Sequence, residues 1–155
     1  MKTLIAYATK GGVTGESAHV IADVLRQKYG FEVDVFDLKK TSTPDIAQYK
    51  NVIIGSGIRM GRWYKRARKM LEHDYTGKNV VLFVSACSAG DPEKHGEAVK
   101  SYLDNMLAKF PHVKPVAVQA FGGRMKMFGK VVDNCDPDKV RTWAEEIGNK
   151  LKEES

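Results

Sequence analysis

Short apolar segments alternate along the chain with longer segments of helical periodicity. Several of the apolar segments, such as Val52-Ile53-Ile54 and Val80-Val81-Leu82, are continuous runs without polar alternation, which is typical of strands covered on both faces. The pattern predicts strands at residues 3–8, 31–36, 52–58, 80–86 and 116–121. Because strands buried on both faces belong to parallel sheets, we expect a parallel sheet.

Apolar residues at helical spacing fill the intervals between these segments and predict helices that cover the sheet. The sets run from Ala18 to Tyr29, Tyr64 to Leu71, Val99 to Phe110 and Val140 to Leu151. Strands that alternate with helices in this way form a three-layer, doubly wound α/β fold. We expect one such domain over residues 1–155, with its ligand bound in the loops that follow the carboxyl ends of the strands.

Local signals mark some of the boundaries between these elements. Asp91-Pro92 and Asp136-Pro137 predict two helix starts, because Asp accepts hydrogen bonds from free helical N–H groups and Pro fits the first helical turn. The stretch from Asp37 to Lys50 is polar and contains Pro44, so it predicts a loop with one short helix at residues 45–49.

The composition excludes several classes of protein. Of the 155 residues, 43% are hydrophobic and 28% are charged, and no apolar run approaches the roughly 18 residues of a membrane-spanning helix. The apolar stretch near the N-terminus is too short for a secretory signal, so we expect a cytoplasmic protein. Two cysteines and four scattered histidines show no metal-ligand spacing. The net charge of +6 favours acidic partners.

The segment after the first predicted strand, Thr9–Ser17, combines glycines with hydroxyl side chains. The N–H groups of such a turn, together with the positive end of a helix, suit a phosphate, although the glycines would also be explained by a tight turn alone. Glu16 stands where a nucleoside-triphosphate loop needs a lysine, which disfavours ATP or GTP hydrolysis. The Gly-x-Gly-x-x-Gly spacing of dinucleotide sites is absent, so a dinucleotide is the second choice.

The chain resembles the flavodoxins in this loop and in the loop after the third predicted strand. Thr9-Lys10-Gly11-Gly12-Val13-Thr14 matches the flavodoxin phosphate loop, Ser/Thr-x-x-Gly-x-Thr, and Met60-Gly61 is similar to the Met-Gly turn of short-chain flavodoxins. The stretch from Gly55 to Trp63 resembles the Gly-x-x-Ile-Arg-x-Gly loop of the flavodoxin-domain group that includes menaquinone-dependent protoporphyrinogen dehydrogenases. The resemblance implies a flavodoxin-like fold with a five-stranded parallel sheet in the order 2-1-3-4-5.

The resemblance also implies noncovalent FMN. Its phosphate would lie in the first loop and its ring between the loops after the third and fourth strands, with Trp63 stacked on the isoalloxazine ring or, alternatively, only packed at a helix start. No residue is expected to be catalytic or to bind a metal. The expected cofactor-binding residues are Thr9, Lys10, Gly11, Gly12, Val13, Thr14, Ser56, Gly57, Ile58, Arg59, Met60, Gly61, Trp63, Ala86, Cys87 and Ser88.

Basic residues gather beside this expected site. Six Lys and Arg residues lie between Arg59 and Lys69 with no acidic residue among them, whereas typical flavodoxins are acidic and place carboxylates beside the flavin. The cluster is either a solvated helix face or a docking surface for an acidic redox protein such as a ferredoxin. No aromatic platform or recognition motif for nucleic acid accompanies it.

These observations favour a low-potential FMN electron carrier between soluble redox partners. Arg59 and Arg62 should stabilise the anionic reduced flavin and make its potential less negative than in acidic flavodoxins. The alternative is an enzyme, an FMN-dependent protoporphyrinogen IX dehydrogenase that passes electrons to a quinone, and a third possibility is a flavin-free binding module. We expect residues 122–130 to pack beneath the last helix; under the enzyme hypothesis they would contact a membrane, a quinone or a porphyrin.

Overall fold

The sheet in the computed structural model, which describes residues 2–41 and 44–154, is built from strands close to the expected positions. Its parallel strands are β1 (Lys2–Ala8), β2 (Glu32–Asp37), β3 (Asn51–Arg59), β5 (Asn79–Ser85) and β6 (Ala117–Phe121). Their order, β2-β1-β3-β5-β6, is the expected 2-1-3-4-5 order. The labels differ because the sequence analysis missed β4 (Arg62–Trp63), which pairs antiparallel with the end of β3.

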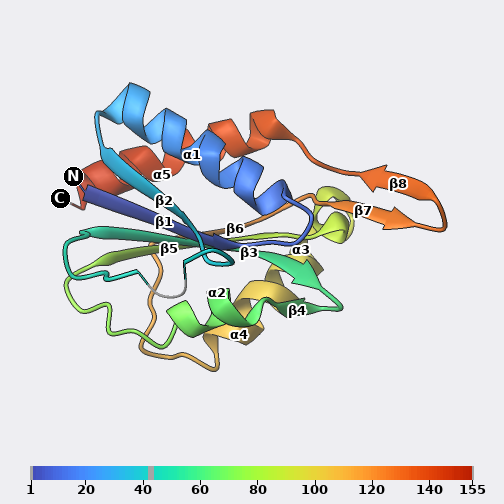
Figure 1. Cartoon of the computed structure of the whole chain (residues 1–155), viewed down its shortest axis with the longest axis horizontal. Coiled ribbons are helices and arrows are strands. Elements are labelled where there is room, and N and C mark those ends of the chain that lie inside the picture. The colour runs from blue at the N-terminus through green and yellow to red at the C-terminus, as the bar shows by residue number, and fades with distance from the viewer. Residues whose placement is uncertain (1, 42–43, 155) are drawn as a thin grey trace.

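Helices cover both faces of this sheet, as the alternating pattern predicted. Figure 1 shows α1 (Val13–Tyr29) and α5 (Pro137–Glu153) on one face, and α2 (Lys65–Met70) and α4 (Asn105–Leu107) on the other. The predicted third helix is interrupted: α3 (His95–Val99) continues into a π-helical turn, η2 (Lys100–Asp104), before α4. Two separate clusters of buried apolar side chains fill the layers above and below the sheet. The three-layer fold is therefore confirmed.

Of the two predicted helix starts, one is confirmed. The Asp136 carboxylate accepts hydrogen bonds from the N–H groups of Asp138 and Lys139, and Pro137 occupies the first turn of α5. The prediction at Asp91 is wrong. Its carboxylate accepts from Glu93 N in a local turn, and α3 begins only at His95, because an Asp side chain that bonds two residues ahead closes a turn as readily as it caps a helix.

The short helix expected at residues 45–49 is absent from the structure. This segment forms a turn instead: Asp45 Oδ1 accepts from Ala47 N, and Tyr49 N donates to Ile46 O. The Tyr49 hydroxyl then donates to the Asp34 carboxylate at 2.6 Å, which fixes the chain as it enters β3. Residues 42 and 43 of the predicted loop lie outside the described part of the chain.

The segment after β6 does not pack beneath the last helix, so that prediction is wrong. It forms an antiparallel hairpin of β7 (Arg124–Met127) and β8 (Lys130–Asp133), which projects from the body of the molecule in Figure 1. Phe128 sits in its turn with a positive φ and 96% of its surface exposed. At the base of the hairpin, Arg124 forms ion pairs with Asp133 of β8 and with Glu16 of α1, with N–O distances of 3.2 and 3.4 Å.

No described helix has the length and apolar character to cross a membrane. Across residues 2–41 and 44–154, no group of three or more His, Cys, Asp and Glu side chains is arranged to hold a metal ion.

Candidate functional site

The candidate site lies where the loops after β1, β3 and β5 meet. These three strands are neighbours in the sheet, so their carboxyl ends bring the loops together. The register places Ser56 of β3 between Ala8 of β1 and Val84 of β5, and Gly57 beside Ser85. The expected residues therefore gather at one edge of the sheet, which is where a doubly wound fold binds its ligand.

The loop after β1 is a tight turn that leads directly into α1. Gly12 adopts a left-handed conformation with φ of 85° and precedes the first helical residue, Val13. The Gly12 N–H donates to Thr9 Oγ1 at 3.2 Å, and Glu16 N–H donates to Gly12 O at 2.9 Å. The loop thus presents the start of a long helix, whose free N–H groups and dipole favour an anion.

Two threonine hydroxyls of this loop point at Gly57 of β3. A Cβ atom placed on Gly57 would lie 3.4 Å from Thr14 Oγ1 and 3.5 Å from Thr9 Oγ1. Thr14 is fully buried, and its hydroxyl has no hydrogen-bond partner among the described residues. Leaving a buried hydroxyl unpartnered costs about 1–3 kcal/mol. Such a group fits a bound acceptor such as a phosphate oxygen better than it fits a purely structural turn.

A second unpartnered hydroxyl lies across Gly57 from this loop. Ser85, the last residue of β5, is buried and its Oγ has no partner among the described residues. In contrast, the predicted site residue Ser56 uses its hydroxyl fully, because Ser56 Oγ donates to Gly57 O at 2.8 Å and accepts from Tyr64 N at 3.1 Å. Ser56 therefore holds the loop in place, while Ser85, which the sequence analysis left out, has a free hydroxyl.

The loop after β3 is a two-residue hairpin turn. Met60 and Gly61 both have positive φ, 52° and 75°, and the flanking pairs are Arg59 with Arg62 and Ile58 with Trp63. Positive φ at both central residues is the geometry that matches the twist of two antiparallel strands. The turn holds Met60 with 91% of its surface exposed.

Trp63 packs in the core just before α2, which agrees with the second of the two roles predicted for it. Only 7% of its surface is exposed, and its indole Nε1 donates to Tyr102 O at 2.7 Å in the π-helical turn η2. The next residue, Tyr64, brings its ring to the site, since its Cε2 would lie 3.2 Å from a Cβ on Gly57. Because neighbouring residues of an extended segment face opposite sides, the β3–β4 pairing decides whether the ring of Trp63 or that of Tyr64 faces the site.

The loop after β5 is held against the end of β6. Ala86 N donates to Phe121 O and Gly123 N donates to Ala86 O, after which η1 (Cys87–Gly90) forms a short 3₁₀ helix. Asn134, which follows the β7–β8 hairpin, donates from Nδ2 to Cys87 O at 2.8 Å. Ala86 is buried, and Cys87 and Ser88 are half-buried. Asn134 fixes this loop although it is remote in sequence.

The first two loops enclose a hollow of about 410 Å³ with a strongly positive lining. Lys39, from the loop after β2, joins the predicted Lys10 and Arg59 there, and none of the described residues that line the hollow carries a carboxylate. Its lining residues are Ala8, Thr9, Lys10, Lys39, Arg59, Tyr64, Lys65 and Arg66. Cations that converge on a concave surface raise the local concentration of anions, so the hollow suits a negatively charged ligand.

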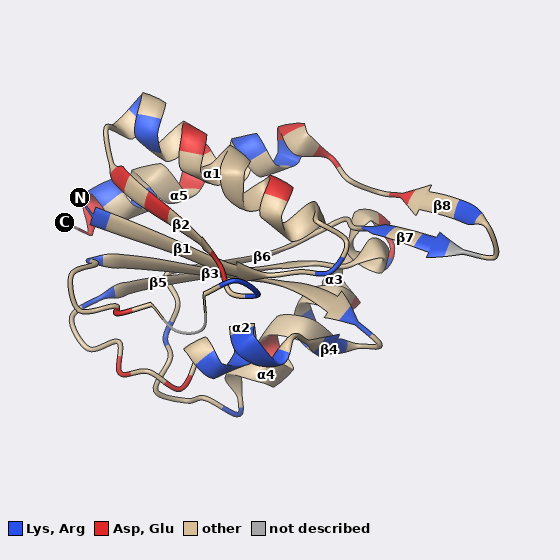
Figure 2. Ribbon diagram, in the orientation of Figure 1, with Lys and Arg blue, Asp and Glu red and all other residues tan. Residues whose placement is uncertain are grey.

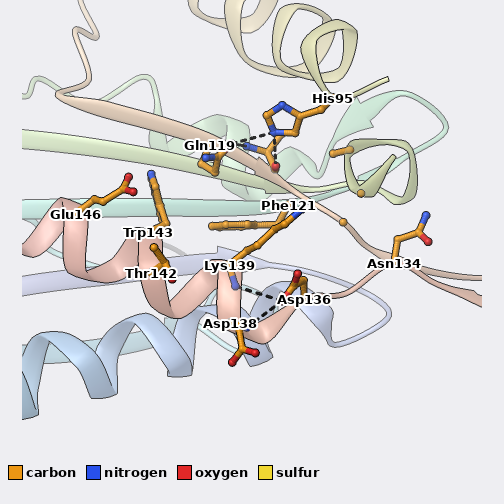
Figure 3. A pocket seen from close by; sticks show the side chains of 14 residues that line it. His95, Gln119, Phe121, Asn134, Asp136, Asp138, Lys139, Thr142, Trp143 and Glu146 are labelled. Atoms are coloured by element: carbon orange, nitrogen blue, oxygen red, sulfur yellow. Dashed lines mark hydrogen bonds between the residues drawn. The ribbon is translucent and has the colours of Figure 1, made fainter. Parts of the chain in front are cut away.

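A second cavity, of about 360 Å³, lies at the free edge of β6 (Figure 3). His95 Nε2 contacts Gln119 Oε1 and Ala120 O, both at 3.0 Å. Because Gln119 Oε1 also accepts from Ala120 N, both contacts are acceptors and Nε2 must carry the imidazole proton. The lining mixes Lys139 with Asp136, Asp138 and Glu146. None of the predicted cofactor-binding residues lines this cavity, so it stands apart from the candidate site.

Comparison with known proteins relates the chain to redox proteins of this fold. The family described as Flavodoxin domain matches residues 4–129. Protoporphyrinogen IX dehydrogenase [quinone] of Escherichia coli K12 is 31% identical over 110 residues, which cover 69% of this chain and only 60% of that protein.

Solved flavodoxin structures share the fold. Flavodoxin 2 of Bacillus cereus superposes with a TM-score of 0.65 at 23% identity, covering 97% of this chain and 99% of that one. A flavoprotein of Lactobacillus acidophilus NCFM, solved in complex with FMN, superposes with a TM-score of 0.55 at 19% identity over 77% of this chain and 92% of its own. With the sequence match spanning most of its length, the chain belongs to the flavodoxin-domain family.

Proposed function

We propose that this protein binds FMN noncovalently and transfers electrons through it. The observation that carries the proposal is the fully buried, unpartnered hydroxyl of Thr14, which faces Gly57 in a loop at the start of α1. The neighbouring structure with FMN supports the choice of flavin. When bound, FMN supplies the redox chemistry, and the protein supplies binding, orientation and electrostatics.

Different residues of the chain would bind different parts of FMN. Thr9 and Thr14 would hold the phosphate with the N–H groups of Gly11 and Val13, and Lys10 would balance its charge. Tyr64 and the Met60-Gly61 turn would flank one side of the ring, and the loop from Ala86 to Ser88 the other. Ser56 and Asn134 would act as positioning residues, because each holds one of these loops by hydrogen bonds.

An electron-carrier role agrees best with the lining of the positively charged hollow. Electron exchange between proteins needs an accessible flavin and a docking surface, and clustered Lys and Arg side chains supply such a surface for an acidic partner. The residues that line the hollow include several Lys and Arg and one Tyr but no carboxylate or imidazole. We therefore infer one-electron exchange with a soluble, acidic redox protein as the working function.

The test is anaerobic reduction of the FMN-loaded protein in small steps, followed by absorption. Two separated one-electron steps support the carrier, and a single two-electron step contradicts it. Failure of the protein to bind FMN at all would refute the flavin proposal and leave the fold alone.

A second function, dehydrogenation of a porphyrinogen with a quinone as acceptor, is favoured by two observations. One is the similarity to the Escherichia coli protein of that name, although the match spans 60% of that protein. The other is the β7–β8 hairpin, whose exposed Phe128, Val131 and Val132 accompany Lys126 and Lys130. Apolar and basic side chains together suit an anionic membrane surface, where a lipid-soluble acceptor is found.

This second function has its own assay. The FMN-loaded protein would be mixed with protoporphyrinogen IX and a soluble quinone, and the fluorescence of the porphyrin product would be followed against protein without FMN. Turnover that depends on FMN, together with cosedimentation with anionic vesicles, would favour the dehydrogenase over the carrier.

A further inference from the structure

Six basic side chains form one exposed surface beside the candidate site. We name it the cationic surface and define it as Arg59, Arg62, Lys65, Arg66, Arg68 and Lys69, all exposed. Figure 2 shows it as blue bands along α2 and at β4. Among the salt bridges between described residues, none involves any of the six. The surface therefore holds positive charge that the protein does not neutralise.

Only part of this charge serves the stability of α2: Arg68 and Lys69 lie in its last turn, where positive charge is favourable, and Arg66 Nη1 donates to Leu38 O and Lys39 O at 2.6 and 2.8 Å. Lys65 and Arg66 occupy the first turn of the helix, which contains no acidic residue, and the preceding Tyr64 provides no side-chain cap. Positive charge is unfavourable near a helix N-terminus, and like charges three or four residues apart, such as Lys65 with Arg68 and Lys69, repel each other. A ligand of opposite charge would relieve both effects.

An apolar side chain stands among these charges. Met60 is 91% exposed at the tip of the β3–β4 turn, directly between Arg59 and Arg62. A second hollow, of about 530 Å³, lies beside it and shares Arg59, Tyr64 and Lys65 with the hollow of the candidate site. Protein interfaces combine an apolar centre, often methionine or an aromatic residue, with a charged rim that selects the partner. The surface has this composition.

We propose that the cationic surface docks an acidic protein, with Met60 at the centre of the contact. A protein fits better than a single-stranded nucleic acid, whose binding sites stack bases on exposed aromatic rings, because Trp63 is buried and Tyr64 lies against Gly57. The identity of this partner as an electron donor or acceptor rests on the proposed function. The docking itself does not, because it requires no flavin.

The test measures binding of an acidic [2Fe–2S] ferredoxin, as the probe, by isothermal titration calorimetry at low ionic strength. The test variant is Arg68→Glu/Lys69→Glu, because both side chains are exposed and neither lines the hollow of the candidate site. The control variant, Lys126→Glu/Lys130→Glu, makes the same change of net charge on the β7–β8 hairpin. FMN affinity of each variant is measured in parallel to confirm an intact fold.

We expect the wild type to bind the ferredoxin, and to lose most of that binding at about 0.5 M salt because exposed charges are screened. The test variant should bind about tenfold more weakly or worse, and the control variant should keep most of the affinity. Equal losses in both variants would show that only net charge matters and would overturn the docking surface.

Two other results would also overturn it. One is the absence of ferredoxin binding by the wild type. The other is binding of a single-stranded oligonucleotide that the test variant abolishes while ferredoxin binding is unchanged. A wild type that binds ferredoxin but not FMN would refute the proposed function and leave the docking surface standing.

Discussion

Replacement of Thr14 by valine should change stability and ligand affinity in opposite directions. Valine keeps the shape of the side chain and removes the hydroxyl, which is fully buried and has no partner among the described residues. Since an unpartnered buried hydroxyl costs about 1–3 kcal/mol, the variant without FMN should be more stable than the wild type by about 1–2 kcal/mol. That gain is large enough to measure by urea unfolding.

The same replacement should weaken the binding of FMN. A hydrogen bond to a charged group contributes about 1.5–3 kcal/mol, so loss of the contact with the phosphate should raise the Kd by roughly 10- to 150-fold. Quenching of FMN fluorescence measures this affinity directly, and riboflavin, which lacks the phosphate, should bind both proteins equally well.

Thr3 provides a matched control. It is also fully buried, but its Oγ1 accepts a hydrogen bond from Asn51 Nδ2 at 3.0 Å. Thr3→Val should therefore destabilise the protein by about 1–3 kcal/mol, because the amide loses a partner in the core. If Thr14→Val destabilised the FMN-free protein as Thr3→Val does, or left FMN affinity unchanged, the assignment of Thr14 to the phosphate would be refuted.

Three further predictions concern charge, packing and pH. Arg59→Glu/Arg62→Glu should lower the potential for forming fully reduced flavin by tens of millivolts, because the anionic product loses positive neighbours; a spectroelectrochemical titration that shows no change would contradict this. Gly55→Ala should destabilise the fold by about 1–3 kcal/mol, since a Cβ there would lie 2.2 Å from the Phe83 ring. A melting temperature equal to that of the wild type would rule out so tight a contact. At the hairpin base, hydrogen bonds from Cys135 and Arg124 lower the pKa of the Asp133 carboxyl to about 2. This depressed pKa means that Asp133 stabilises the base above about pH 4 and that the effect is lost as the pH falls through about 2. The protection of the hairpin amides relative to their intrinsic exchange rates should therefore fall over that window in the wild type and stay constant in Asp133→Asn.

The sheet could be predicted from the sequence because burial on both faces demands continuous apolar runs. Val80 to Val84 has no polar position, so its strand assignment does not depend on any partner. The hairpins lack this signal: β4 has only two residues, and β7–β8 is exposed. Nothing in the hydrophobic pattern separates an exposed hairpin from a loop, and the packing predicted for residues 122–130 was wrong for this reason.

In the site, local sequence located the loops but not the side chains that face one another. Thr9 and Thr14 were identified as hydroxyl side chains in a glycine-rich loop that resembles the flavodoxin phosphate loop, and the structure brings both to Gly57. The ring that lies beside Gly57 belongs to Tyr64 and not to Trp63, because the pairing of Ile58 with Trp63 turns the indole toward Tyr102. Lys39 and Asn134 were missed because they reach the site from the loop after β2 and from the far side of a hairpin. Only the three-dimensional fold brings these residues there.

The most direct test of the account is the visible absorption of the FMN-loaded protein during stepwise anaerobic reduction, compared with Thr14→Val at the same FMN concentration. The account predicts that the wild type holds one equivalent of FMN and is reduced in two separated one-electron steps, while the variant holds much less flavin. A wild type that binds no FMN would contradict the central claim, and one that binds FMN but is reduced in a single two-electron step would contradict the electron-carrier role.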